Sequence, residues 1–65
     1  MLKPYQVRVL VELEYLAEKI ESLDTISGNN WYAEVPRNEK DLLRQQLHLM
    51  KEYKNVLKKR VALYK

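Results

Sequence analysis

The stretch LLRQQLHLMKEYKNVLKKRVALY, residues 42–64, decides the fold of this chain. It contains neither glycine nor proline, and a set of its apolar residues recurs at intervals of three and four. That interval places the set along one side of an α-helix. We therefore predict a helix over residues 38–63, with an apolar stripe formed by Leu43, Leu47, Met50, Tyr53, Leu57, Val61 and Tyr64.

A second helix is predicted upstream, over residues 4–26. Pro4 suits a first helical turn, where its missing N–H is not needed. The residues that follow are rich in leucine, glutamate, lysine and alanine, which favour helices. The apolar stripe of this helix consists of Tyr5, Val9, Leu13, Leu16, Ile20 and Leu23.

The connector between the two helices covers residues 27–37. It opens with Ser27-Gly28-Asn29-Asn30, a cluster of turn-forming residues in which Gly28 could adopt a positive φ angle. Asn38 is the predicted N-cap of the second helix. Two helices and one connector predict an all-α fold, an antiparallel two-helix hairpin that forms one domain over residues 1–65.

The hairpin leaves apolar residues without a partner. Packing one helix on another needs an apolar arc only a little over 100° wide, and both helices exceed it. The excess residues are Leu42, Leu49, Val56 and Leu63 on the second helix and Val7, Leu10 and Val11 on the first. We therefore predict a compact homo-oligomer; the alternative is that these are scattered surface residues, which are common.

Composition narrows the classes of function. The chain has 65 residues, no cysteine and a single histidine, His48, which excludes disulfides and thiolate metal sites and predicts no metal or other cofactor. The net charge of +3 gives a mild preference for anionic partners. No apolar run approaches the roughly 20 residues of a membrane helix. The N-terminus also lacks the apolar region of a secretion signal, so we expect neither a membrane partner nor secretion.

The sequence contains no arrangement typical of an enzyme. Glu14, Glu18 and Glu21 share helical spacing, and paired carboxylates can act as acid and base. We expect them instead to form a solvated edge that faces three lysines of the other helix, Lys51, Lys54 and Lys58. His48 lies opposite the apolar side of its helix and is predicted to be exposed rather than catalytic. These residues favour a binding protein.

Several aromatic and cationic residues are candidates for binding. Tyr5 and Arg8 are neighbours on one helix, and a ring with a guanidinium can stack on a base and hold a phosphate. The alternative for Tyr5 is that it caps the end of the hairpin. Lys19 lies beside the apolar stripe and borders any interface formed there. Trp31 and Tyr32 either close the open end of the hairpin or stack on a base.

Two arginines of the second helix are also candidates. Arg44 lies toward the connector, and Arg60 borders the apolar arc near the end of the chain. A cation at an interface costs desolvation unless it is paired. Each arginine therefore needs a carboxylate or an anionic ligand, and Glu12 of a neighbouring subunit is a candidate partner for Arg60.

Three segments of the chain, in their order and spacing, resemble a known family. They are Tyr5-Gln6-x-Arg8-Val9, Lys19-Ile20 with Leu23 following, and Leu42-Leu43-Arg44-x-Gln46-Leu47-x-x-Met50-x-x-Tyr53-x-x-x-Leu57-x-x-Arg60-Val61. They resemble the helical-hairpin family of phage anti-CBASS proteins, a hairpin that also occurs within a Thoeris anti-defence protein. The resemblance covers essentially the whole chain. It implies a homohexamer that sequesters cyclic oligonucleotide second messengers, such as cGAMP, without cleaving them, in the cytoplasm of the infected bacterium.

The resemblance also implies two kinds of ligand site. Family members hold cyclic dinucleotides between paired subunits, and some hold cyclic trinucleotides in separate sites near the three-fold axes. The family's base-stacking tyrosine matches Tyr5 and its phosphate-associated lysine matches Lys19, with Arg8 joining them as the neighbour of Tyr5. The arginine associated with the trinucleotide site matches Arg44, with Arg60 as the competing match.

Two other functions stay open from the residues alone. One is a small structural or assembly bundle that self-associates without a ligand. The other is a hairpin that binds polymeric nucleic acid through its basic residues, Lys51, Lys54, Lys58, Lys59, Arg60 and Lys65. Binding to a polymer should weaken steeply as salt rises, whereas a small buried ligand should be less sensitive.

Overall fold

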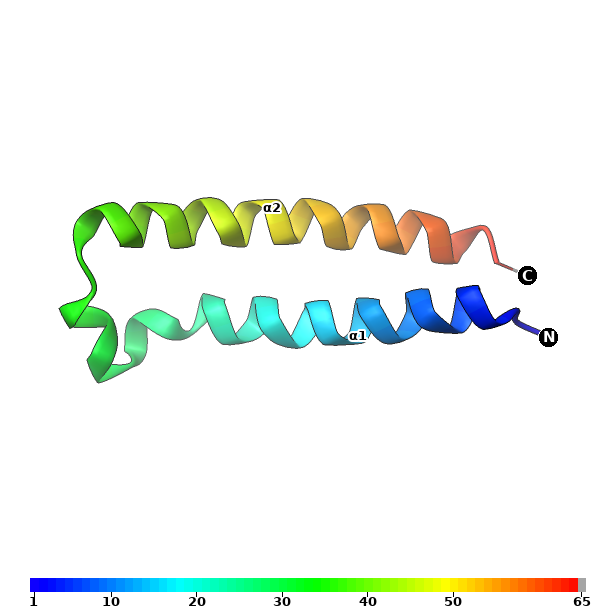
Figure 1. Cartoon of the computed structure of the whole chain (residues 1–65), viewed down its shortest axis with the longest axis horizontal. Helices are drawn as coiled ribbons and strands as arrows, with labels where there is room; N and C mark the ends of the chain where they lie inside the picture. Colours follow the sequence, from blue (N-terminus) through cyan, green and yellow to red (C-terminus); the bar gives the residue numbers. More distant parts are fainter. Residues whose placement is uncertain (65) are drawn as a thin grey trace.

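Two antiparallel helices lie side by side along the length of the molecule (Figure 1). The computed structural model describes residues 1–64, apart from the side chain of Ser27, so the predicted basic residue Lys65 lies outside the described residues. Helix α1 covers Pro4–Asp24 and helix α2 covers Arg37–Ala62. Two short 3₁₀ turns, η1 (Ile26–Gly28) and η2 (Asn30–Glu34), connect them. The predicted all-helical hairpin is confirmed, and both termini lie at the same end.

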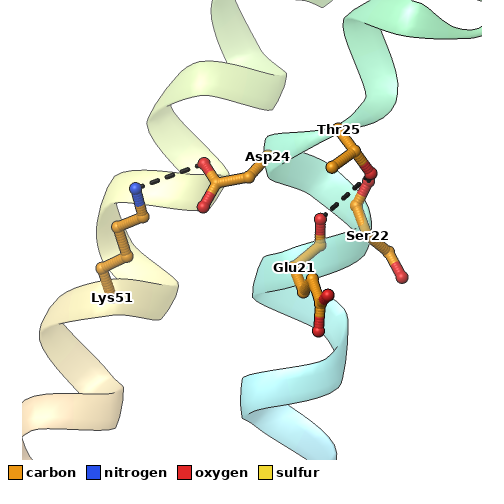
Figure 2. A network of polar contacts seen from close by, with 5 residues as sticks. All are labelled: Glu21, Ser22, Asp24, Thr25 and Lys51. Carbon is orange, nitrogen blue, oxygen red and sulfur yellow. Dashed lines mark hydrogen bonds and ion pairs between the residues drawn. The ribbon is translucent and has the colours of Figure 1, made fainter.

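The two ends of α1 are set by local hydrogen bonds. Pro4 occupies the first turn as predicted, and the Lys3 backbone N–H just before it donates to the side-chain oxygen of Gln6 at 2.8 Å. At the other end the Thr25 hydroxyl donates to the carbonyl of Glu21 at 3.2 Å (Figure 2). A side chain bonded to these last carbonyls competes with continuation of the helix. Helix α1 accordingly ends at Asp24, two residues before the predicted boundary at Ile26.

The predicted N-cap of α2 is wrong. Pro36, in an extended conformation, occupies the cap position, and its carbonyl accepts the first helical hydrogen bond from the Lys40 N–H at 2.9 Å. Asn38 lies inside the first turn, where its side-chain oxygen accepts from the Glu39 N–H at 2.9 Å. The fixed φ angle of a proline suits this extended start, so the cap lies two residues before Asn38 and the helix begins at Arg37.

The connector does not use the conformational freedom of its glycine. No residue in the described part of the chain has a positive φ angle, Gly28 included. The chain reverses through η1 and η2 instead, with hydrogen bonds such as that from the Asn29 N–H to the Ile26 carbonyl at 3.0 Å. The predicted turn is present, but Gly28 does not adopt the positive φ angle open to it, because consecutive 3₁₀ turns reverse the chain with ordinary backbone angles.

The core is a narrow line of side chains between the helices. Its buried members are Val9, Leu16, Ile20 and Leu57, and Leu57 is 0% exposed. The partly buried residues around them are Leu13, Leu47, Met50, Val61 and Tyr64. These residues belong to the two predicted stripes, which confirms the periodicity. Two stripe residues are exceptions: Tyr5 is 49% exposed at the end of the hairpin, and Tyr53 is 43% exposed at the edge of the core.

A second apolar line runs along α2 outside the core. We call it the apolar ridge; it consists of Leu42, Leu49, Val56 and Leu63, whose exposed fractions range from 52% to 78%. Val7 and Val11 are exposed on α1, as predicted, whereas Leu10 is half-buried. Fully burying one leucine or valine stabilises a protein by about 1.5–3 kcal/mol. A single hairpin with four buried side chains therefore leaves considerable stabilisation for other chains to supply.

No helix within residues 1–64 is both long enough and apolar enough to cross a bilayer.

Candidate functional site

Lys19 lies on the wall of an open hollow between the two helices. This hollow, the Lys19 hollow, has a volume of about 490 Å³. Its lining residues are Tyr15, Glu18, Lys19, Ser22 and Leu23 of α1 and Gln46 and Met50 of α2. The α1 residues are three or four apart, so they share one side of the helix. The hollow therefore combines an ammonium, a carboxylate, a hydroxyl, an amide and an aromatic ring above apolar side chains.

A polar contact between the helices borders this hollow. The Tyr53 hydroxyl of α2 donates to the carboxylate of Glu12 on α1. Both residues line a smaller hollow of about 170 Å³ together with Tyr15 and Lys19. The hydrogen bond to the Glu12 carboxylate raises the pKa of Tyr53, while the positive charge of Arg60 opposes the rise. Tyr53 thus links the two helices beside Lys19.

The predicted dinucleotide residues do not lie together within one chain. Tyr5 packs its ring edge-on against Tyr64, with centroids 6.3 Å apart, at the end that holds both termini. This placement matches the alternative in which Tyr5 caps the hairpin. Fourteen residues separate Tyr5 from Lys19, about 21 Å along the helix axis at about 1.5 Å per residue. Arg8 is exposed one turn from Tyr5, so it shares that end of the molecule.

The two predicted trinucleotide arginines also lie apart. Arg44 is exposed and forms an ion pair with Asp41 at 3.7 Å. Arg60 follows it by sixteen residues, about 24 Å along α2 and about 160° around it. Arg60 lies instead on the side of Tyr53, where its positive charge opposes the rise in the pKa of that hydroxyl. A single chain therefore places the two arginines in different sites.

Arg44 borders a hollow of its own at the connector. This connector hollow has a volume of about 220 Å³ and is lined by Leu23, Asp24, Ile26, Tyr32, Leu43, Arg44 and Leu47. Arg44 and Gln46 differ by about 200° around α2, so the connector hollow and the Lys19 hollow open on opposite sides of the hairpin. Lys19 and Arg44 thus belong to separate surfaces.

Glu14, Glu18 and Glu21 are exposed on α1, as the predicted solvated edge requires, but within the described residues they do not pair with the lysines of α2. Among residues 1–64 none of these glutamates forms an ion pair, and Lys51 instead pairs with Asp24 at 3.3 Å (Figure 2). The reason is angular, because Glu14 and Glu21 lie on the outer side of α1, whereas Asp24 faces α2. Both members of the pair are half-exposed, so the contact is worth at most about 1 kcal/mol.

Solvent exposure distinguishes the alternative roles predicted for His48, Trp31 and Tyr32. His48 is exposed, as predicted, and its Nε2 lies 3.3 Å from the Glu52 carboxylate on the same helix. Tyr32 is half-buried beside the connector hollow, with the Lys40 ammonium 4.7 Å from its ring centre. Trp31 is exposed and contacts Tyr32 only edge-on. Tyr32 therefore fits the end-closing alternative, and Trp31 does not.

The described residues contain no cluster of three histidine, cysteine or acidic side chains that could hold a metal ion. The Glu12 carboxylate, predicted to meet Arg60 of a neighbouring subunit, is bonded to Tyr53 within its own chain. Its contact with a neighbour remains a prediction.

Sequence reasoning missed two residues of the Lys19 hollow, Tyr15 and Gln46. Tyr15 lies outside the apolar stripe, so the periodicity gave it no role. The usable signal was its position four residues before Lys19, which makes the two side chains neighbours on a helix. Gln46 belongs to the other helix, and only the register of the hairpin brings it opposite Lys19.

Comparison with known proteins assigns the chain to a family. A family model described as Sequestin matches residues 3–63, nearly the whole chain. No significant match was found among curated proteins or among solved structures. The name denotes sequestration, so the match indicates a binding protein rather than an enzyme, and it confirms the resemblance drawn from the sequence. The chain belongs to the Sequestin family.

Proposed function

We propose that this protein binds cyclic oligonucleotide second messengers and sequesters them without cleavage. During phage infection it would withhold these messengers, cGAMP among them, from CBASS effectors in the bacterial cytoplasm. The observation that carries the proposal is the Sequestin match over residues 3–63. The geometry around Lys19 supports a site for an anionic ligand with flat bases.

Lys19 is suited to hold a phosphate. Its side chain is exposed at the wall of a hollow of about 490 Å³, a size typical of sites for small organic ligands. Within the described residues Lys19 forms no ion pair with a carboxylate of its own chain. Its ammonium can therefore form charge-assisted hydrogen bonds with a ligand phosphate, which are stronger than neutral ones.

The site for a cyclic dinucleotide is completed by a second subunit. Tyr5 and Arg8 lie about 21 Å from Lys19 along α1, which is too far for one small ligand. A two-fold axis places the same surface of two chains face to face in opposite directions. It can therefore bring Tyr5 and Arg8 of one chain beside Lys19 of the other.

The exposed apolar residues support assembly into a homohexamer. The apolar ridge and the exposed valines of α1 lie on surfaces that a single chain leaves uncovered. Burying each leucine or valine against another subunit contributes about 1.5–3 kcal/mol. Six chains of charge +3 carry roughly +18 in total, which attracts anionic ligands.

A second site for cyclic trinucleotides belongs at Arg44. This arginine lies on the opposite side of the hairpin from Lys19, beside an apolar hollow and the half-buried ring of Tyr32. The separation favours independent sites for the two ligands. Arg60 is the alternative residue, and its position near Tyr53 would place the trinucleotide on the Lys19 side.

Equilibrium dialysis followed by recovery of the ligand tests the proposal. The protein should retain 3′,3′-cGAMP on its side of the membrane, and heating the sample should release the compound intact, as measured by chromatography. Retention of neither cGAMP nor cyclic triadenylate would leave a structural bundle as the better account. Recovery of a linear product would make the protein an enzyme and end the proposal.

Mixing two defective variants tests the shared site. Tyr5→Ala and Lys19→Gln should each lose affinity for cGAMP as pure proteins. When the two are unfolded together and refolded, mixed pairs contain one intact combination of Tyr5 from one chain and Lys19 from the other. Binding should therefore return in the mixture. Mixed oligomers without any binding would show that Tyr5 and Lys19 do not meet across subunits.

A further inference from the structure

Tyr15 presents an aromatic ring that neither the core nor the predicted site uses. It is 64% exposed, more than any other tyrosine or the tryptophan of the chain. It lies in the middle of α1 and lines three neighbouring hollows, of about 490, 190 and 170 Å³. Exposing a large ring in this way forfeits the stabilisation that its burial would contribute, and it leaves the ring accessible to a ligand.

Tyr15 and Lys19 form a pair on one side of the helix. Residues four apart on a helix have Cβ atoms about 5–6 Å from each other. Both side chains line the Lys19 hollow and the smaller hollow beside Tyr53. An aromatic ring beside a cation is the combination that binds a nucleobase next to its phosphate.

The opposite wall supplies a group for the edge of a base. Gln46 of α2 lines the same hollow, and its only described side-chain hydrogen bond is a loose one of 3.9 Å to the sulfur of Met50. An amide both donates and accepts hydrogen bonds. Leu23 and Met50 add apolar surface beneath. The hollow thus provides one nucleotide unit with a ring for the face of its base, an amide for the edge of that base, and an ammonium for its phosphate.

We propose that Tyr15 stacks on a nucleobase of the ligand whose phosphate Lys19 binds, with Gln46 contacting the edge of that base. This inference rests on the proposed function and adds residues to its site. The base meets Tyr15 in the chain that also holds the phosphate, while the Tyr5 ring arrives from the second subunit. Each base of a cyclic dinucleotide then has a tyrosine available to it, Tyr15 from one chain and Tyr5 from the other.

Calorimetric titration of 3′,3′-cGAMP into Tyr15 variants tests the inference. Tyr15→Leu keeps the apolar bulk but removes the flat ring, whereas Tyr15→Phe keeps the ring and removes only the hydroxyl. Stacking of a base on an aromatic side chain corresponds to roughly a 5- to 150-fold change in affinity. We expect a loss in that range for Tyr15→Leu and less than a few-fold loss for Tyr15→Phe. His48→Ala, on the far side of α2, serves as the matched control and should bind like the wild type.

The outcomes separate the inference from the function on which it rests. If the wild type binds cGAMP and Tyr15→Leu binds equally well, Tyr15 does not stack on the ligand and the inference is overturned. If the wild type binds neither cGAMP nor cyclic triadenylate, the proposed function itself fails.

A fluorescence experiment distinguishes a loss of base stacking from a loss of assembly. Tyr15→Trp in a Trp31→Phe background places a single fluorescent ring at the site. Bound cGAMP should quench its emission at the same ligand concentrations that produce heat in the titration. Heat without any change in emission would contradict stacking, even where Tyr15→Leu fails to assemble.

Discussion

Leu57→Ala should remove a large share of the stability of the hairpin. Leu57 is 0% exposed and is the only fully buried side chain among the described residues. Truncating a buried leucine to alanine costs about 2–5 kcal/mol, because the lost transfer energy is joined by the cost of a cavity. A chain of 65 residues has a free energy of unfolding of roughly 3–10 kcal/mol in total. The variant should therefore be largely unfolded or close to it at ordinary temperature.

Urea denaturation followed by helical circular dichroism measures this effect. Each protein should be studied at several concentrations, because association adds to the apparent stability. Lys58→Ala is the matched control, since Lys58 is the exposed neighbour of Leu57 on the same helix. It should change the free energy of unfolding by no more than about 0.5 kcal/mol. Equal stability of the two variants would refute the assignment of the core to the Leu57 side of α2.

Three further predictions concern assembly, pH and the second site. Leu49→Glu should lower the mass measured by light scattering while keeping the helical signal, because Leu49 belongs to the exposed apolar ridge; an unchanged mass would remove the ridge from the interface. The raised pKa of Tyr53 means that its hydrogen bond to Glu12 stabilises the fold below about pH 10 and is lost as pH rises through the pKa of the folded state. Tyr53→Phe should therefore flatten the alkaline part of the stability profile, and an unaltered profile would contradict the contact. Arg44→Ala should weaken binding of cyclic triadenylate and spare cGAMP; equal loss of both would argue against separate sites.

The periodic parts of the sequence predicted the periodic parts of the structure. The two stripes identified the buried residues Val9, Leu16, Ile20 and Leu57. The excess apolar residues were predicted from their seven-residue spacing, and the ridge is exposed as that spacing required. These predictions succeed because helical geometry fixes which residues share a side before any tertiary contact forms.

The helix boundaries and the polar contacts between side chains were predicted less well than the core. Asn38 has the side chain of a good N-cap, but Pro36 occupies the cap because its fixed backbone angle already suits that position. Lys51 pairs with Asp24 rather than with a glutamate because the register of the two helices decides which charges meet. Both outcomes depend on competition among nearby residues, which periodicity does not describe.

Of the residues that line the candidate site, the sequence pointed only to the cation, Lys19, as a ligand contact. Lys19 was identified through the family resemblance, and the structure places it beside a hollow. Tyr15 and Gln46 were missed because neither belongs to a stripe and because Gln46 reaches the hollow only through the packing of α2 on α1. Tyr5 and Arg8 were grouped with Lys19, but their separation along α1 keeps them out of one site within a single chain. A site shared between subunits cannot be assembled from the spacing within one sequence.

The most direct test is a calorimetric titration of 3′,3′-cGAMP into the purified protein, with light scattering on the same sample. The proposal predicts saturable binding of the dinucleotide in a particle of six chains, at sites built from Tyr5 of one chain and Lys19 of its partner. A six-chain particle that binds neither cGAMP nor cyclic triadenylate would contradict sequestration. A monomer would contradict both the assembly and the shared site.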